Sequence, residues 1–245
     1  KVLIIMAYLG GCVDDEGRLD DPISSFKAAS EPYDDEHYEL ALQRLGEFKS
    51  RFPYSANATK AELMIADSYF QLGNYLEAAY AYENFLTLHP EYPQLDFVQY
   101  RTGLSYWKKS PKAINREQNL TQKAIDAWKN LKLKYPKSSF LLKSSSLVEE
   151  GTIRIIKSQQ SIATFYCKQK VWHSCAYRHL EVLEKIPSTL RVLKIISLSE
   201  ASSALKHLLE EENTIENLLS KKWDKNKMLN KVSLLQKEIK SLSQK

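Results

Sequence analysis

Apolar side chains recur along the middle of this 245-residue chain in a pattern that appears three times. In each copy, large apolar residues follow a small residue by four and seven positions, and a proline comes five positions later. Positions 0, 4 and 7 share one face of an α-helix, and a following proline ends the helix. The copies are Ala41, Leu45, Phe48 and Pro53; Ala78, Tyr82, Phe85 and Pro90; and Ala124, Trp128, Leu131 and Pro136.

A partner helix precedes the second and third copies, and each is marked by a small residue with tyrosine three positions later. These pairs are Ala66 with Tyr69 and Gly103 with Tyr106. The closing prolines at 53, 90 and 136 are 37 and 46 residues apart. Tetratricopeptide repeats have this pattern, with a period of about 34 residues. We therefore predict tetratricopeptide repeats, with a loop inserted into the third repeat over residues 108–119.

Weaker versions of the pattern extend the prediction in both directions. The first partner helix is assigned to residues 22–29, with Phe26 and Ala29 facing inward, although Pro32 stands where a tyrosine is expected. A fourth, degenerate unit is marked by Ala163, Tyr166, Ala176, Leu180 and Leu183, and a fifth helical stretch covers 190–209. The predicted fold is an all-α solenoid of about five helix-turn-helix units over residues 22–212, with an extra C-terminal helix in a basic tail, residues 213–245.

The tail carries eight lysines against three acidic residues, a net charge of +5. Its apolar residues are spaced by four and three positions, and this stripe either caps the solenoid or docks on a partner. The stripe consists of Met228, Val232, Leu235, Ile239 and Leu242. A basic face of this kind is usually solvated or meets an acidic partner. No aromatic interleaving or reader motif accompanies the lysines, so nucleic acid is not an expected partner.

The first residues are typical of a secreted lipoprotein. Residues 1–11 contain an apolar run too short to span a bilayer, but suited to a signal peptide whose basic start is truncated to Lys1. The run ends in Leu-Gly-Gly-Cys12, which resembles the bacterial lipobox, a motif cleaved before its cysteine. That resemblance implies a lipidated Cys12, and Val13 in place of aspartate favours the outer membrane. Residues 12–21 are then an acidic tether. The alternative is a buried segment with an incidental cysteine.

No catalytic constellation accompanies the repeats. The five histidines show no metal-binding spacing, and the sequence contains no nucleophile elbow, phosphate-binding loop or dinucleotide fingerprint. Acidic pairs lie in polar stretches, where they are solvated. We therefore expect no enzyme activity, no cofactor and no metal.

Two cysteines remain once Cys12 is assigned to the anchor. Cys167 and Cys175 fall on either side of a predicted turn, so an oxidising compartment would permit a disulfide if their Cα atoms approach within about 7 Å. The alternative, two separate small core residues, is the one that we favour.

Three aromatic residues lie off the repeat's core positions. Phe70, Tyr100 and Trp107 fall on inner helices, which line the concave face of such solenoids. A groove lined in this way binds an extended or helical peptide. Ordinary packing is the alternative for each residue.

Further motifs resemble one family, the BamD (ComL) outer-membrane assembly lipoproteins. They cover about residues 12–140 together with the lipobox. They read Arg51-Phe52-Pro53-x-Ser55, His89-Pro90-x-Tyr92-Pro93, Asp96-Phe97-x2-Tyr100-x2-Gly103-Leu104, and Tyr135-Pro136-x-Ser138-x-Phe140. In the inserted loop, Arg116-Glu117-Gln118 stands where the family usually has Arg-Asp-Gln.

The resemblance implies five repeats, attachment to the periplasmic face of the outer membrane, and service in the β-barrel assembly machinery beside other assembly lipoproteins. In that family the C-terminal repeats contact the POTRA domains of the barrel subunit, and the N-terminal repeats form a pocket for unfolded barrel substrates. Phe70, Tyr100 and Trp107 would lie near that pocket, with Arg116 in the loop after it. The fourth and fifth repeats depart from the family pattern, and the lysine-rich tail is additional.

Two other functions fit the same architecture. One is a pilotin-like tetratricopeptide lipoprotein that escorts a secretin or pilus component; the Arg-Glu-Gln loop and the His-Pro-x-Tyr-Pro segment favour barrel assembly over it. The other is an envelope enzyme or adaptor acting on peptidoglycan, which the lack of catalytic residues disfavours.

Overall fold

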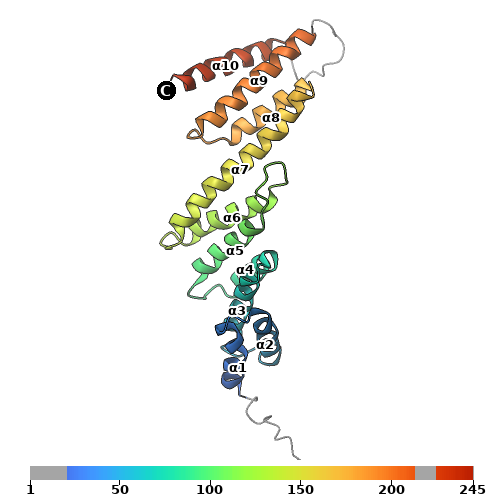
Figure 1. Ribbon diagram of the computed structural model, residues 1–245. Coiled ribbons are helices and arrows are strands. Elements are labelled where there is room, and N and C mark those ends of the chain that lie inside the picture. Colours follow the sequence, from blue (N-terminus) through green and yellow to red (C-terminus); the bar gives the residue numbers. More distant parts are fainter. Residues whose placement is uncertain (1–20, 213–224, 245) are drawn as a thin grey trace, which may run out of the picture. The chain divides into compact units, whose positions relative to one another are not determined.

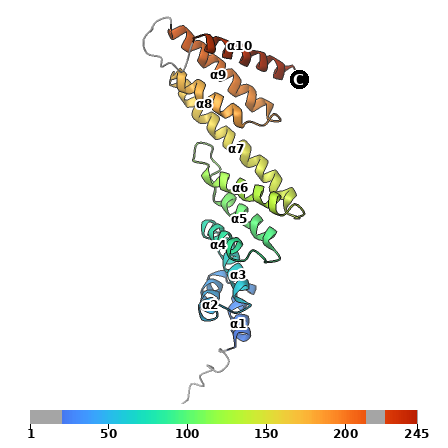
Figure 2. The ribbon, with the colours of Figure 1, turned by 180° about the vertical axis from the view of Figure 1, so that it is seen from behind.

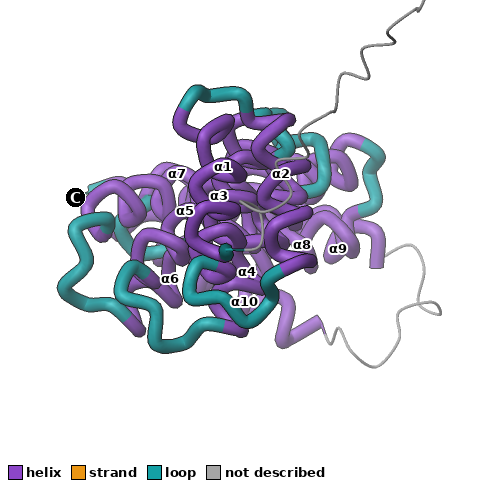
Figure 3. The backbone as a smooth tube through the Cα atoms, turned by 90° about the horizontal axis from the view of Figure 1, so that it is seen from below, coloured by secondary structure: helices purple, strands orange, loops and turns teal. Residues whose placement is uncertain are grey.

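A computed structural model describes residues 21–212 and 225–244. Over these ranges the chain forms ten helices and no strand (Figures 1 and 3). The helices are α1 (Pro22–Asp34), α2 (Tyr38–Arg51), α3 (Ala58–Gln71), α4 (Tyr75–Leu88), α5 (Leu95–Lys109), α6 (Asn119–Lys134), α7 (Leu141–Lys168), α8 (Trp172–Lys185), α9 (Arg191–Glu212) and α10 (Lys225–Ser243). The predicted signal peptide, Cys12 and nearly all of the acidic tether lie outside the described residues. The chain divides into two compact units between Lys108 and Lys109.

The first unit is built on the predicted repeat faces. The small and large apolar residues at positions 0, 4 and 7 of α2 and α4 are all buried, which confirms the predicted register: Ala41, Leu45, Phe48, Ala78, Tyr82 and Phe85. Helix α2 packs against both α1 and α3, and α3 also packs against α4. Gly73 lies in the turn between α3 and α4 with φ of 77°, a conformation that glycine adopts without steric cost.

Helix α1 is longer than predicted. Asp21 caps its start by accepting a hydrogen bond from the Ser24 amide at 2.9 Å, and the helix continues through Pro32 to Asp34. A proline in the last turn removes only one intrahelical donor, so α1 can extend past it. The inward placement of Phe26 and Ala29 is confirmed: Ala29 is buried and the rings of Phe26 and Phe48 are 5.4 Å apart.

In the second unit, the third repeat buries its predicted apolar face, whereas the buried face of the fourth repeat differs in part from the predicted one. Ala124, Trp128 and Leu131 of α6 are buried as predicted. In α8 the fully buried side chains include Cys175, Ala176, His179 and Val182, while Leu180 and Leu183 are only partly buried. Ala176 of the predicted face is thus confirmed as buried, whereas Cys175, His179 and Val182 are buried more deeply than Leu180 and Leu183. Leucine spacing does not predict a histidine at a core position.

The C-terminal helix packs on the solenoid itself. Val232 and Leu235 of α10 are buried in one cluster with Leu198 and Leu205 of α9, and the Lys194 ammonium lies 2.7 Å from the Glu238 carboxylate. Helices α8, α9 and α10 lie side by side in two opposite views (Figures 1 and 2). Of the two roles considered for the apolar stripe, Val232, Leu235, Ile239 and Leu242 take that of a cap, while the side chain of Met228 lies outside the part of the chain that the structure describes.

The fold is an all-α tetratricopeptide-repeat solenoid, as predicted. Among the residues described, no helix combines the length and the apolar character needed to cross a bilayer.

Candidate partner-binding surfaces

Arg101 is the central polar residue of the first unit's inner helices. From α5 its guanidinium carbon lies 4.2 Å from the centre of the Phe70 ring and 5.2 Å from that of Phe97. Its Nη2 atom is 3.6 Å from a carboxylate oxygen of Asp67 on α3. Asp67 also accepts a hydrogen bond from the Tyr82 hydroxyl of α4. One cation thus joins two aromatic rings to a buried acid.

Burial is the largest influence on the pKa values of the acidic and tyrosine side chains around Arg101. It raises the pKa of Asp67, against the opposing effects of the Tyr82 hydrogen bond and the Arg101 charge. Burial, followed by the nearby Asp67 charge, raises the pKa of Tyr33 to about 12 and that of Tyr82 further. These hydroxyls therefore stay protonated at neutral pH, and the Tyr82 hydroxyl donates to Asp67.

The three aromatic residues predicted to line a groove are each partly packed and partly exposed. Phe70, Tyr100 and Trp107 are each half-buried on α3 and α5, as expected for inner helices. Phe70 contacts the Tyr75 ring edge-on at 5.3 Å and lies beneath Arg101, so one of its faces is already used in packing. Tyr100 precedes Arg101 on α5. Sequence reasoning missed Arg101 and Asp67; the available signal was a carboxylate directly after the small core residue Ala66.

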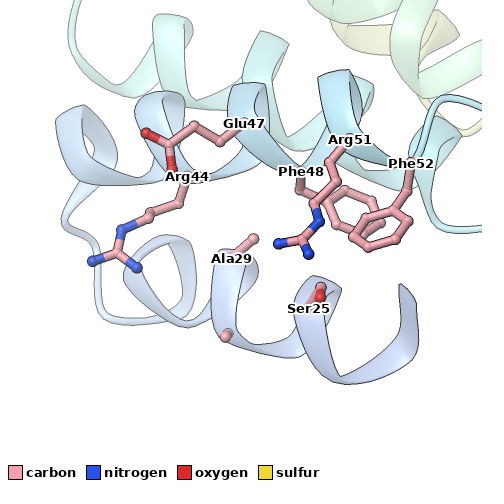
Figure 4. A pocket seen from close by; sticks show the side chains of 8 residues that line it. Ser25, Ala29, Arg44, Glu47, Phe48, Arg51 and Phe52 are labelled. Atoms are coloured by element: carbon pink, nitrogen blue, oxygen red, sulfur yellow. The ribbon is translucent and has the colours of Figure 1, made fainter. Parts of the chain in front are cut away.

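A second surface of the first unit lies between α1 and α2 (Figure 4). Here a hollow of about 190 Å³ is lined by Ser25, Ala28, Ala29, Arg44, Glu47, Phe48, Arg51 and Phe52. Arg44 and Arg51 extend from α2 on the side of α1, with the two phenylalanine rings beside Arg51. The Arg51 guanidinium carbon is 5.4 Å from the centre of the Phe52 ring. The Arg-Phe part of a motif quoted above therefore lines a hollow with an apolar floor and two cations.

The inserted loop of the second unit borders a larger hollow. It measures about 520 Å³ and is lined by Asn115, Arg116, Glu117, Gln118, Asn119, Gln122, Ile155, Ser158, Gln159 and Ile162. Arg116 is exposed at its edge, whereas Gln118 is buried. The Gln118 amide donates to the carbonyls of Ala113 and Arg116, both at 3.0 Å, and its oxygen accepts from the Thr121 hydroxyl at 2.7 Å. In the Arg-Glu-Gln motif, glutamine holds the loop and arginine is left facing solvent.

The His-Pro-x-Tyr-Pro segment has a structural role. His89 ends α4, and its Nε2 atom lies 2.5 Å from the Glu62 carboxylate of α3, which the Lys49 ammonium also reaches at 3.0 Å. Burial opposes ionisation of Glu62, but the hydrogen bonds from His89 and Lys49 outweigh it and lower the pKa of the carboxyl. The Tyr92 ring packs edge-on against Phe85 at 5.0 Å.

Cys167 and Cys175 form a disulfide between α7 and α8, with their Cα atoms 4.9 Å apart. Our preference for two separate core cysteines was wrong, because the three-residue turn between the helices brings their ends together. His179, one turn further along α8, is fully buried. Burial lowers the pKa of its imidazole to about 4, so the ring is neutral at pH 7.

Comparison with known proteins identifies a family whose sequence model matches this chain. The family model YfiO, described as an outer membrane lipoprotein, matches residues 20–217. Two proteins named "Outer membrane protein assembly factor BamD" are similar. That of Rickettsia prowazekii (strain Madrid E) is 26% identical over 191 residues, which are 77% of this chain and 76% of the relative. That of Neisseria meningitidis serogroup A (strain Z2491) is 23% identical over 202 residues, covering 78% and 76%. A solved Podosopora anserina putative kinesin light chain with TPR-like repeats covers 89% of this chain and 98% of its own, at 12% identity and a TM-score of 0.36.

Proposed function

Because this chain belongs to the YfiO family of outer membrane lipoproteins, we propose that it is a non-catalytic scaffold in the assembly of outer-membrane β-barrel proteins. The observation that carries the proposal is the family match over residues 20–217, which includes all of α1 to α9. Relatives that are similar over three quarters of their own length are named outer membrane protein assembly factors.

The proposed partners are of two kinds. The first are the POTRA-bearing barrel subunit and the other assembly lipoproteins, which act as stable partners. The second are unfolded outer-membrane protein segments, bound transiently by the aromatic surface around Phe70, Tyr100 and Trp107. Support comes from half-buried aromatic side chains beside a cation, which suit extended peptides with alternating aromatic and polar residues.

Arg116 is proposed as a contact for one of these protein partners. Its side chain is exposed on a loop whose backbone is held by Gln118, so it is presented without being buried on its own chain. Loops fixed in this way on a helical scaffold commonly carry binding residues.

We place the protein on the periplasmic face of the outer membrane, attached through lipid on Cys12. The lipobox-like Leu9-Gly10-Gly11-Cys12 and the family's description as a lipoprotein support this. Several acyl chains on one residue give durable attachment, since each buried CH₂ contributes about 0.8 kcal/mol.

The test is co-purification of the tagged, lipidated protein from gently solubilised envelopes, with mass spectrometry of the bound chains. Recovery of a POTRA-containing barrel in proportion to the tagged protein is the expected result. Recovery of a secretin or pilus subunit without such a barrel would contradict the proposal and favour the pilotin-like function.

A further inference from the structure

Four side chains with metal-ligand chemistry converge in the second unit. Cys167 comes from the last turn of α7, Cys175 and His179 from α8, and Glu200 from α9. One ligand atom from each lies within 4.8 Å of every other. Cys175 and His179 are four residues apart, so one helix face presents both. Residue spacing alone does not predict this site, because its members are spread over 34 positions.

His179 is the unexplained member. Its side chain is fully buried, yet neither ring nitrogen has a hydrogen-bond partner. A buried polar group without a partner is costly, on the order of 1–3 kcal/mol, and leucine would fill a core position more favourably. A neutral imidazole with a free nitrogen is the form that binds metals.

The surroundings would exclude water from a bound ion. Cys175 lies in one buried cluster with Ala176, Leu198 and Ala201, and Cys167 packs against the same cluster. Glu200 is partly buried beside it. A carboxylate and an imidazole so placed, within reach of two sulfur atoms, make a mixed sulfur, nitrogen and oxygen donor set.

We propose that Cys167, Cys175, His179 and Glu200 form a redox-gated site for a thiophilic divalent cation of the zinc class. While the disulfide is intact, the sulfurs are bonded to each other and the site is closed to metal. When the disulfide is reduced, the two thiolates, one His179 nitrogen and one Glu200 oxygen supply four ligands. Zinc sites with four protein ligands of these types are tetrahedral.

The chemistry needs a dithiol reductant. A dithiol transfers two electrons and two protons to the Cys167–Cys175 bond, yielding two thiols here and a disulfide on the donor. Binding of the cation then displaces the two thiol protons, since thiolates are the metal-binding form. With both thiolates and the Glu200 carboxylate, three negative charges surround a charge of +2.

The geometry requires only a local movement. The sulfurs are 2.07 Å apart in the disulfide, whereas two thiolates on one tetrahedral zinc, each with a bond of about 2.3 Å, are separated by about 3.8 Å. Cys167 lies in the final turn of α7, next to the short 169–171 connection. Rotation of this side chain can open the pair while His179 stays fixed in the core.

The experiment uses the full chain with Cys12→Ser in every sample, so that Cys167 and Cys175 are the two remaining cysteines. Protein reduced with a phosphine under argon is titrated with Co²⁺, whose thiolate charge-transfer bands and intense visible bands report tetrahedral sulfur ligation; Zn²⁺ is then added in competition. We expect one equivalent of Co²⁺ bound by the reduced protein, displaced by Zn²⁺, and none bound by the oxidised protein.

Matched variants distinguish coordination of the metal ion by His179 and Glu200 from non-specific metal binding elsewhere on the protein. His179→Leu and Glu200→Gln should each weaken Co²⁺ binding by more than 10–100-fold, which is the usual loss when a residue that only hydrogen-bonds to a metal ligand is replaced. The controls His37→Leu and Glu184→Gln change exposed residues of the same types and should leave binding unchanged.

The proposal is overturned if the reduced protein binds no Co²⁺, if the oxidised protein binds it equally well, or if His179→Leu and Glu200→Gln both bind like the control variants. Circular dichroism checks that each variant is folded. Should His179→Leu fail to fold, the Cys167→Ser and Cys175→Ser variants replace it, and normal Co²⁺ spectra in both would equally contradict the proposal.

Discussion

The guanidinium carbon of Arg101 lies 4.2 Å from the centre of the Phe70 ring, so a cation of α5 covers an aromatic residue of α3. The same guanidinium is paired with Asp67, which is buried. Arg101 therefore links the aromatic surface proposed for peptide binding to the polar interior of the first unit. Any substitution there is expected to alter stability as well as binding.

Replacing Arg101 with alanine should destabilise the protein by about 3 kcal/mol, because it leaves the Asp67 carboxylate buried without its cation. Denaturant unfolding measures this loss. The matched control is Lys108→Ala, an exposed cation on the same helix, which should change stability by less than about 0.5 kcal/mol. Equal effects of the two substitutions would show that Arg101 has no special role in stability.

Glu62→Gln should lower the free energy of unfolding at neutral pH. It should also make that free energy fall less steeply as the pH is lowered. The folded-state pKa of Glu62 lies below its ordinary value of 4.5, so the carboxylate's contribution is fully present above that value. The contribution is lost as pH falls through the lower folded-state pKa. Unfolding free energies measured from pH 7 to pH 3 test this.

The exposed Glu91→Gln is the control for that series, because Glu91 lies outside the Lys49 and His89 cluster. It should follow the wild-type pH curve. A Glu62→Gln curve parallel to that of the wild type over the whole range would contradict the expected role of the cluster.

Periodicity predicted the parts of this fold that depend on burying apolar side chains. Tyr82 and Trp128 are at most 1% exposed, as their repeat positions required. Spacing could not reveal that α1 passes through Pro32, since one missing donor near a helix end is tolerated. It also could not place Arg101 against Phe70 or Glu200 near His179, because such contacts depend on how helices distant in sequence come together.

Replacing Cys12 with serine should leave the repeats folded and release the protein from membranes. The reason is that the lipid proposed for this residue is the only attachment assigned to the chain. Membrane flotation measures the bound fraction, and circular dichroism reports the fold. Ser24→Ala, at the start of α1, is a control that should remain membrane-bound. Undiminished flotation of Cys12→Ser would refute lipid attachment at this position.

A photo-crosslinking side chain at position 100 should capture unfolded outer-membrane protein segments. Tyr100 lies half-exposed on α5 next to Arg101, within the surface proposed for peptides. The same reagent at Tyr54, which is fully exposed between α2 and α3, serves as the control. Crosslinks of equal yield at both positions would mean that the unfolded chain does not prefer the aromatic surface.

Depletion of the protein in its source organism tests most directly whether it serves the assembly of outer-membrane β-barrels. Folded barrels in the outer membrane are followed by their resistance to unfolding in detergent as the protein is depleted, with secretin assembly measured in parallel. We predict that folded barrels decline generally, unfolded precursors accumulate, and expression of the wild-type chain restores both. Normal levels of folded barrels after depletion, with only a secretin or pilus component lost, would contradict the account.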